Sequence, residues 1–535
     1  MIAFLRRMLP TAALVAAGWS AGPAAAEVTP FALSLAAAAS EDAEMAAFYR
    51  EAGYDPLWTG SDAEDRARRA ALLRAVGRAE LHGLPAGRYE VEQLLSGAVS
   101  ERERGRVEAA LTRTFLRLAA DLNGGLLAPG AVVPEIKRDR PDLDRAALLR
   151  ELEAAPPQEV MRGLPPQGAE YTRLMRARLE LVAAIRDGSW GDPVRIPRLE
   201  RGDSGPDVVA LRDRLIALGY LERTATTRFD AEIDSAVNAF QSDHGLAVDG
   251  IVGDRTLGEL NGSPERRLGQ VLVALERERW MNVDRGARHV WVNLADFRTR
   301  LVVEGETVFE TKSVIGERDH QTPEFSDAME HMVINPYWYV PRSIVVEEYL
   351  PDLRRNPRAH GQLQILDRNG RVVSRNRSFA GYTAQSFPFT MRQAPGPENA
   401  LGRVKFMFPN RYSIYLHDTP AQHLFAQPVR AFSHGCIRLD DPYDFAEELL
   451  RLDGEPDPRG TFERHLRSGD NRKVPLSEPL PVHLVYRTAI AKADGGMEYR
   501  GDVYGRDARI LNALISEGVR LPGLDRRLAL SGVTD

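Results

Sequence analysis

Cys436 is the only cysteine among the 535 residues of this chain, and it lies in the run Ser433-His434-Gly435-Cys436-Ile437-Arg438-Leu439. A single thiol has no partner within its own chain, so a structural disulfide would require a second molecule. The remaining roles are an apolar core filler, a metal ligand or a nucleophile. The adjacent histidine and glycine favour the nucleophile, because attack on an amide requires a base for the thiol and donors for the developing oxyanion.

Two histidines are candidates for the base. His434 is on the same face as Cys436 if this stretch is extended, but the two α-carbons are then roughly 6–7 Å apart, which is long for direct contact. His417 ends the run 412–417 and can face the thiol from a neighbouring strand. The fifteen residues between His417 and Ser433 are enough for a loop that returns the chain.

Two further residues suit the same chemistry. Gly435 permits a close approach of the backbone, so the amide hydrogens of Gly435 and Cys436 are expected to face the oxyanion. Arg438 lies two residues past the thiol and therefore on the same side of a strand. A guanidinium in that place suits a carboxylate on the substrate.

The residues from about 288 onward are expected to form the sheet that positions this chemistry. Apolar and polar residues alternate there in short runs, as they do in half-buried strands. The runs are 289–294, 300–305, 310–315, 333–341, 412–417 and 482–489. Residues 343–395 interrupt the strands with a helix over 344–353 and a hairpin at 367–370, and we interpret this insertion as a lid near the site. A final helix is expected over 507–517.

A compact module precedes the sheet, from about Leu199 to Leu260. Two helical faces carry apolar residues at three- and four-residue spacing, the first with Val208, Leu211, Leu215 and Leu218, the second with Ile233, Val237 and Phe240. Asp249-Gly250 predicts a tight turn before a short third helix. This order of motifs resembles the peptidoglycan-binding module of cell-wall enzymes, a small three-helix domain. We interpret the apolar positions as core residues rather than ligand contacts.

Residues 28–191 are expected to be a mostly helical scaffold. Stretches such as 62–80 and 101–123 place apolar residues at helical spacing, and breaks rich in proline and glycine separate them. We find no catalytic constellation in this region. The cluster 54–58 is interpreted as a packing anchor, and residues 188–197 as the linker to the module.

The N-terminus has the pattern of an export signal. Arg6 and Arg7 precede an apolar stretch from Met8 to Trp19 and three alanines that end at Ala26, which predicts cleavage after residue 26. The apolar stretch is short for a membrane-spanning helix. Removal of the two arginines changes the formal net charge from −6 to −8, and no basic patch points toward nucleic acid.

The segment from His417 to Arg438 resembles the catalytic motif of the L,D-transpeptidases. The likeness extends to Gly316, Thr322-Pro323 and residues 395–402 and 405–410, and residues 415–420 (Tyr-Leu-His-Asp-Thr-Pro) are close to a large periplasmic subfamily of Gram-negative bacteria. The resemblance implies a multidomain α+β fold with a mainly-β catalytic domain. Its parts are a signal peptide (1–26), a helical scaffold domain (27–190), a three-helix peptidoglycan-binding module (198–261) and an L,D-transpeptidase catalytic domain (270–535) with a capping insertion (about 343–395).

The resemblance also implies a role for each residue of the motif. Cys436 is implied as the nucleophile and His417 as the base. Ser433, His434 and Gly435 are implied to support the nucleophile and to shape the oxyanion hole.

Two more residues are implied to touch the substrate. Tyr415 has the same strand parity as His417 and is expected to line the site. Arg438 stands where several family members have asparagine, so its role stays open between substrate contact and loop support.

The implied reaction is acyl transfer in two steps. The thiolate attacks the L,D bond after the third residue of a tetrapeptide stem, normally meso-diaminopimelate, and the terminal D-alanine leaves a thioester behind. An amine of a neighbouring stem then forms a 3→3 cross-link, so stem peptides are the implied donor and acceptor. No metal or organic cofactor is implied, carbapenems are implied inhibitors, and the implied compartment is the periplasm, with no membrane span in the mature chain.

Several alternatives stay open at the level of sequence. Cys436 is either the nucleophile, a buried apolar thiol, or a zinc ligand with His417 and His434, although no further ligand spacing supports zinc. Water as the acceptor would make the protein an L,D-carboxypeptidase, and an outer-membrane lipoprotein would make it an attachment enzyme. A non-catalytic wall-binding protein is the alternative from another class, and the intact Ser-His-Gly-Cys run argues against it.

Overall fold

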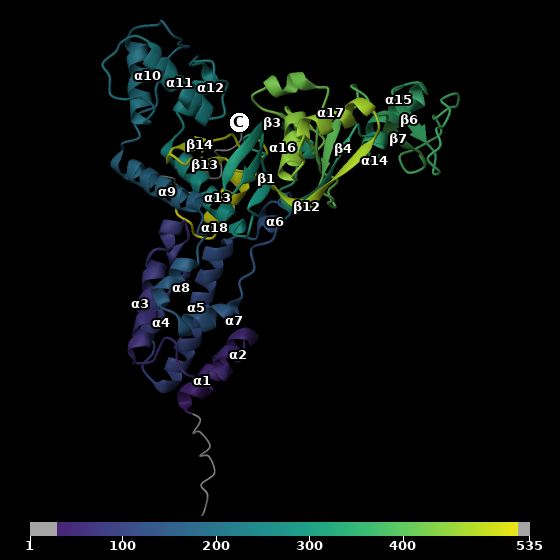
Figure 1. The fold of residues 1–535 in the computed structure, drawn as a ribbon. Coiled ribbons are helices and arrows are strands. Elements are labelled where there is room, and N and C mark those ends of the chain that lie inside the picture. Colours follow the sequence, from purple (N-terminus) through teal and green to yellow (C-terminus); the bar gives the residue numbers. More distant parts are fainter. Residues whose placement is uncertain (1–28, 523–535) are drawn as a thin grey trace, which may run out of the picture. The chain divides into compact units, whose positions relative to one another are not determined.

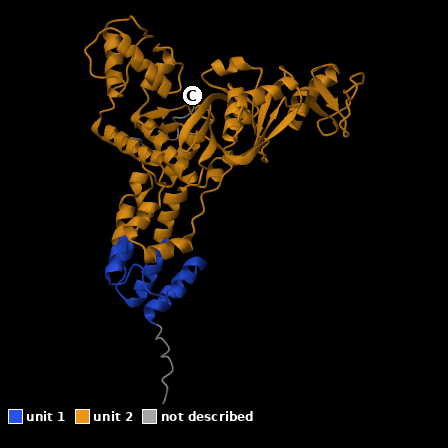
Figure 2. Cartoon of the chain, viewed as in Figure 1, with its two compact units in different colours: residues 1–69, 91–113 blue, residues 70–90, 114–535 orange. Residues whose placement is uncertain are grey.

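The computed structural model describes residues 29–522. They divide into two compact units, one made of the residues up to 69 together with 91–113, the other of 70–90 and the residues from 114 onward (Figure 2). The expected signal segment, residues 1–26, lies outside the described residues. None of the described helices has the length and apolar character that crossing a membrane requires.

The first unit is helical, and a buried carboxylate organises it. Its elements are α1 (Pro30–Ala39), α2 (Ala43–Glu51), α4 (Val91–Ser96) and the beginnings of α3 (Ala63–Gly77) and α5 (Glu101–Gly124). Glu108 on α5 accepts hydrogen bonds from the backbone N–H groups of Leu57, Trp58 and Thr59. Trp58 is fully buried, and its indole N–H donates to Thr112. Within the cluster 54–58, Leu57 and Trp58 are therefore the residues that pack, whereas Asp55 is exposed.

Helix α13 (Pro264–Trp280) lies at the centre of the second unit, and nearly all of its residues are buried. Ser263 begins it as an N-cap that accepts from the Arg266 N–H, and Pro264 suits the first helical position. Helix α9 (Ala169–Asp187) packs along it. The other helical segments before it are η1 (Ala79–His82), η2 (Ala86–Arg88), α6 (Pro129–Val132), α7 (Arg145–Ala154) and α8 (Pro157–Gly163).

The module between α9 and α13 has the three predicted helices, α10 (Pro206–Ala217), α11 (Ala231–Asp243) and α12 (Asp254–Leu260). The predicted apolar faces form its core, in which Leu218 is partly buried and the other six residues are buried. The Gln241 side chain accepts from the N–H groups of Asp249 and Gly250 and donates to the Ile251 carbonyl, which fixes the predicted turn before α12.

The remainder of the second unit is built on a nine-stranded sheet with the order β10-β3-β11-β9-β8-β4-β12-β1-β2. Because β3 also pairs with β2, the sheet closes on itself around an apolar core (Figure 1). The strands are β1 (Arg288–Asn293), β2 (Arg298–Val303), β3 (Glu306–Gly316), β4 (Phe325–Ile334), β8 (Val404–Met407), β9 (Leu416–His417), β10 (Ala431–Ser433), β11 (Ile437–Leu439) and β12 (Arg472–Val485).

Further helical segments and a hairpin complete this part of the chain. They are η3 (Arg318–His320), η5 (Gln422–Ala426), α16 (Pro442–Leu452), α17 (Pro458–Ser468), β13 (Ala489–Ala491), β14 (Met497–Tyr499) and α18 (Arg506–Ser516). Helix α18 packs against α13 and is the helix predicted over 507–517. The multidomain α+β fold with a large sheet agrees with the prediction from sequence.

Three predicted strands are interrupted, and backbone conformation explains two of the breaks. The run 482–489 leaves the sheet after Val485, where β12 ends, and β13 begins at Ala489. The run 333–341 divides at Asn335, whose φ of +51° ends β4 and separates it from β5 (Trp338–Tyr339). The run 412–417 contains Ser413 with a φ of +58°, so only Leu416 and His417 are extended as β9. A left-handed residue cannot continue a β-ladder, and side-chain alternation alone does not reveal it.

The insertion has a small core of its own. Helical segments α14 (Arg342–Ile344), η4 (Val345–Tyr349) and α15 (Leu350–Arg355) precede β6 (Leu363–Leu366) and β7 (Thr390–Gln393), which pair with β5 in a three-stranded sheet. Buried apolar residues from these segments pack on one another, among them Leu353, Phe379 and Met391. The Gly370 N–H donates to the Asp367 carbonyl and closes the predicted hairpin.

Candidate active site

The cysteine lies in a sharp turn between two short strands. β10 ends at Ser433, and β11 begins at Ile437. Gly435 has a φ of +111°, a conformation that side-chain-bearing residues rarely adopt. Ser433 Oγ closes the turn, because it accepts from the Gly435 N–H at 3.1 Å and donates to the Cys436 carbonyl at 2.5 Å. The stretch around the thiol is therefore not one continuous strand.

A second hydroxyl fastens this turn to the end of β3. Thr322 Oγ1 donates to the Gly435 carbonyl at 2.7 Å and accepts from the Gly316 N–H at 2.9 Å. A side chain at Gly316 has no room, since its Cβ would lie 2.1 Å from the His320 carbonyl oxygen. Gly316 and Thr322, both part of the sequence resemblance, are thus supports of the turn.

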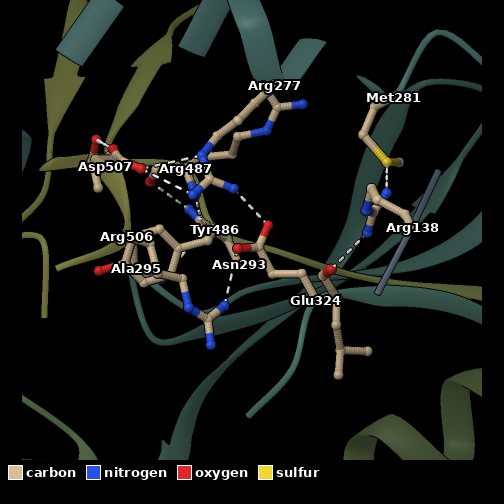
Figure 3. Close-up of polar contacts among 12 residues, drawn as sticks. Arg138, Arg277, Met281, Asn293, Ala295, Glu324, Tyr486, Arg487, Arg506 and Asp507 are labelled. Carbon is tan, nitrogen blue, oxygen red and sulfur yellow. Dashed lines mark hydrogen bonds and ion pairs between the residues drawn. The ribbon is translucent and has the colours of Figure 1, made fainter. Parts of the chain in front are cut away.

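Figure 3 shows a buried ionic network that includes Arg277, Glu324, Arg506 and Asp507. Arg506 donates to the Thr322 carbonyl at 2.7 Å and pairs with one oxygen of Glu324 at 2.9 Å. Arg277 pairs with the other oxygen of Glu324 at 2.6 Å and with Asp507 at 3.0 Å. Burial raises the pKa of Glu324, but the neighbouring guanidinium groups outweigh burial and hold that pKa below its ordinary value. The network fixes the segment that carries Thr322.

The thiol of Cys436 is half-buried and contacts residues of the neighbouring loop and strand. Its Sγ lies 3.5 Å from the Ser413 carbonyl oxygen, and the Tyr415 side chain also interacts with it. Burial raises the pKa of Cys436 to about 11, although hydrogen bonds from Tyr415 and the charges of Arg438 and Lys405 act in the opposite direction. At neutral pH the Cys436 thiol is therefore protonated, and it would need a base in order to act as a nucleophile.

His417 is oriented as such a base. Its Nδ1 lies 2.5 Å from the Asp418 carbonyl, which only accepts, so Nδ1 carries the hydrogen and Nε2 keeps its lone pair. Burial lowers the pKa of His417 to about 3, and the charges of Arg438 and Lys405 contribute to this shift. No hydrogen bond between described residues joins His417 to Cys436. Such bonds often form only when substrate is bound.

Two cations flank His417 in the sheet. Lys405 on β8 pairs in register with His417, and His417 pairs in register with Arg438 on β11. Residues that pair across adjacent strands lie on the same face, so the three side chains form one row. The Arg438 Nε is buried and lacks a hydrogen-bond partner among the described residues, which suits a carboxylate from a ligand.

Lys405 is the residue whose role sequence reasoning missed. It is half-buried, and its Nζ lies 5.5 Å from the centre of the Tyr415 ring. The sequence signal that could have drawn attention to Lys405 is its position between two apolar residues of a strand, Val404 and Phe406, which are buried. Only the register of β8 against β9 shows that this lysine faces the site, and that register is a long-range property.

His434 points away from the thiol and toward the capping insertion. Its Nε2 lies 3.0 Å from Glu348 Oε1 on η4, and its ring centre is 4.8 Å from that of His320. Its imidazole, exposed by 41%, is a link between the cap and the catalytic turn. The possible metal ligands Glu317, His320 and His434 have donor atoms within 4.8 Å of one another. That cluster includes neither Cys436 nor His417, so the described geometry does not assemble the zinc alternative.

Of the two backbone donors expected to face an oxyanion, those of Gly435 and Cys436, the turn engages one. The Gly435 N–H was expected to face the substrate, but it is already bonded to Ser433 Oγ, because the left-handed glycine folds its amide back into the turn. The Cys436 N–H makes no hydrogen bond to any described residue. The Cys436 N–H is therefore available to a ligand, whereas the Gly435 N–H is held within the turn.

The raised thiol pKa predicts slow alkylation of Cys436 at neutral pH. We expect the rate with iodoacetamide, followed by intact mass, to increase about tenfold per pH unit from pH 7 to 10, since only the thiolate reacts. Arg438→Gln removes a charge that lowers the thiol pKa and should slow alkylation further, whereas Arg411→Gln, an exposed neighbour, should not. A plateau below pH 8 would instead indicate a preformed thiolate.

Family comparisons agree with these three parts of the chain. Residues 287–463 match the family model of the "L,D-transpeptidase catalytic domain", residues 43–177 that of the "Scaffold domain", and residues 204–260 that of the "Putative peptidoglycan binding domain". Each match lies within the range expected from sequence for the corresponding part.

Individual relatives cover only portions of the chain. The "Putative L,D-transpeptidase" of Haemophilus influenzae is 31% identical over 223 residues, which are 41% of this chain and 45% of that protein. The N-acetylmuramoyl-L-alanine amidase CwlM of Mycobacterium tuberculosis is 40% identical over 78 residues, or 13% of this chain and 19% of that protein. The chain thus spans less than half the length of the curated relatives it matches.

Two solved structures have low similarity scores. An L,D-transpeptidase from Xylanimonas cellulosilytica is 16% identical with a TM-score of 0.17, over 55% of this chain and 100% of that one. An L,D-transpeptidase from Stackebrandtia nassauensis is 14% identical with a TM-score of 0.21, over 54% and 96%. TM-scores this low carry no structural argument.

Proposed function

Because the chain carries an L,D-transpeptidase catalytic domain over residues 287–463 and a peptidoglycan-binding domain over residues 204–260, we propose that it forms 3→3 cross-links in peptidoglycan. The donor is a tetrapeptide stem that loses its terminal D-alanine, and the acceptor is an amine of a neighbouring stem. Cys436 is the nucleophile. The protein acts in the periplasm after export by its N-terminal segment.

The row of Lys405, His417 and Arg438 beside the thiol is the observation that carries this proposal. A thiol and a neutral imidazole supply the nucleophile and the base. Two adjacent cations, one with an unpaired buried nitrogen, supply a site for the carboxylate that ends the donor peptide. A purely structural cysteine would require none of these neighbours.

Substrate binding would strengthen the base. The terminal carboxylate of the donor offsets part of the positive charge of Arg438 and Lys405, and the repulsion that helps to lower the pKa of His417 is then reduced. The Nε2 of His417 accepts the thiol proton as Sγ attacks the carbonyl carbon before D-alanine. The Cys436 N–H donates to the oxyanion. Collapse breaks the carbon–nitrogen bond, His417 returns the proton to the leaving amine, and a thioester remains.

The second step reverses these roles. The acceptor amine attacks the thioester carbonyl, and His417 accepts a proton from the amine. Collapse breaks the carbon–sulfur bond, the new amide forms the cross-link, and the proton returns to the Cys436 sulfur. Water in place of the amine would give a tripeptide, so the acceptor distinguishes a transpeptidase from an L,D-carboxypeptidase.

Intact mass of the mature protein after incubation with a disaccharide-tetrapeptide tests this function, with Cys436→Ala as the matched control. We expect a thioester adduct and a 3→3 dimer with the wild type alone. Tripeptide as the sole product would establish the carboxypeptidase instead. Neither adduct nor product, with retained wall binding, would establish the non-catalytic alternative.

A further inference from the structure

A large cleft lies in the second unit between the three-helix module and the catalytic part. Its volume is about 2080 Å³, and its walls come from the end of α11 through α12, from residues 295–298 and 428–430, and from residues 500–508. Pockets for single small molecules are typically about 300–1,000 Å³. The cleft therefore has the size for a longer ligand.

Direct contacts hold the module against the catalytic part at one side of the cleft. Asp243 at the end of α11 pairs with Lys492 at 3.0 Å, and its carbonyl accepts from Arg500 at 2.6 Å. The ring of Tyr499 lies 5.7 Å from His244 and 4.5 Å from the guanidinium of Arg267. These contacts between the module, α13 and the β13–β14 hairpin make the cleft a built feature of the unit.

The catalytic wall of the cleft continues to the supports of the cysteine turn. Gln321, in the wall, lies between His320 and Thr322, and Arg318, also in the wall, lies four residues before Thr322. Tyr504, also in the wall, donates its hydroxyl hydrogen to the Gly316 carbonyl, and Thr322 in turn holds the Gly435 carbonyl. The cleft wall and the cysteine turn are therefore linked through Gly316 and Thr322.

Two exposed arginines stand on opposite walls of the cleft. Arg255 belongs to α12 of the module and makes no ion pair or hydrogen bond with the described residues. Arg318 belongs to the catalytic wall, and only its Nε is engaged, by the Val503 carbonyl at 3.1 Å. Other arginines of the cleft form ion pairs: Arg266 pairs with Glu259, and Arg500 pairs with Glu498. Two free guanidinium ends match a ligand that carries repeated carboxylates.

We propose that this cleft binds a peptide-bearing glycan strand, and that Arg255 and Arg318 receive carboxylates of its stem peptides. The module and the catalytic part then hold one strand together, so a stem is delivered to Cys436 from a strand already bound by the module. This inference rests on the proposed function and names contact residues of the module that the sequence left unassigned.

Binding and turnover of charge-reversed variants test the cleft. Full-length Arg255→Glu and Arg318→Glu are compared with Arg198→Glu, an exposed arginine of the same module outside the cleft. Binding to purified sacculi is measured in a Cys436→Ala background. Turnover is measured with Cys436 intact, once on sacculi and once on a soluble disaccharide-tetrapeptide. We expect each cleft variant to weaken sacculus binding about tenfold, with soluble-substrate rates within twofold of wild type.

The outcomes separate the cleft from the reaction. The proposal that the cleft binds the strand is wrong if both cleft variants bind sacculi as tightly as the parent protein. It is also wrong if Arg198→Glu loses as much sacculus binding as they do. A loss on the soluble substrate as large as that on sacculi also overturns it, because Arg318 would then act at the reaction centre. If the wild type forms no thioester with the soluble substrate, the proposed function is wrong. The binding of sacculi by the variants in the Cys436→Ala background still tests whether the cleft holds the strand.

Discussion

Replacement of His417 by alanine should reduce acylation of Cys436 by a tetrapeptide by about 10³-fold at pH 7. The thiol pKa of about 11 leaves very little thiolate at that pH, so the reaction depends on a base with a free lone pair. His417 has such a lone pair at Nε2, because its Nδ1 donates to the Asp418 carbonyl. The rate of thioester formation, measured by rapid quench and mass spectrometry, gives the effect.

His434→Ala is the informative comparison for this experiment. His434 is closer to the cysteine in sequence, but its imidazole contacts Glu348 in the cap rather than the thiol. We expect at most about a tenfold loss for His434→Ala, and a similar loss for Glu348→Gln, since both remove the same link. The assignment of the base is wrong if His434→Ala is as inactive as His417→Ala. Recovery of the His417→Ala reaction at high pH would show that only proton removal is missing.

Glu324→Ala should destabilise the second unit by about 3–5 kcal/mol, the range for removal of one partner from a buried ion pair. The change leaves Arg277 and Arg506 buried without their shared carboxylate. It also weakens the support of Thr322, whose carbonyl accepts from Arg506. In a unit of this size the loss corresponds to a decrease of about 3–6 °C in the melting temperature, measured by calorimetry on the full chain.

Glu330→Ala serves as the control for stability. Glu330 lies on the same strand, β4, but is exposed and makes no ion pair with the described residues, so its removal should change the free energy of unfolding by about 0.5 kcal/mol or less. Equal melting temperatures for the two variants would contradict a structural role for the network. A normal melting temperature with lost acylation in Glu324→Ala would place the carboxylate in the reaction instead.

The sequence predicted best what depends on short-range pattern. The core of the module follows from apolar spacing, and residues such as Val208, Leu211 and Phe240 are buried as predicted. The packing role of Trp58 follows from its apolar cluster. The nucleophilic role of Cys436, which also rests on a short-range motif, stays a prediction.

What the sequence did not predict depends on contacts between distant segments. The row of Lys405, His417 and Arg438 requires the register of three strands, and alternation within one strand does not fix register. The His434–Glu348 pair joins a turn to an insertion, and extended geometry was assumed for His434 because nothing in the run shows the left-handed φ of Gly435. The ends of the runs at Asn335 and Ser413 were missed for the same reason, since φ is set by the folded surroundings.

The position of β12 in the closed sheet has a consequence for how the protein folds. β12 pairs with β4 and, in parallel, with β1, where Val290 lies opposite Val482. Such a pairing has a high contact order, and chains dominated by non-local pairs fold slowly. During synthesis the cysteine turn emerges before its barrel has a closing strand. Until the residues of β12 are available, a nascent chain contains every residue of the proposed reaction centre but lacks the closed sheet that aligns them.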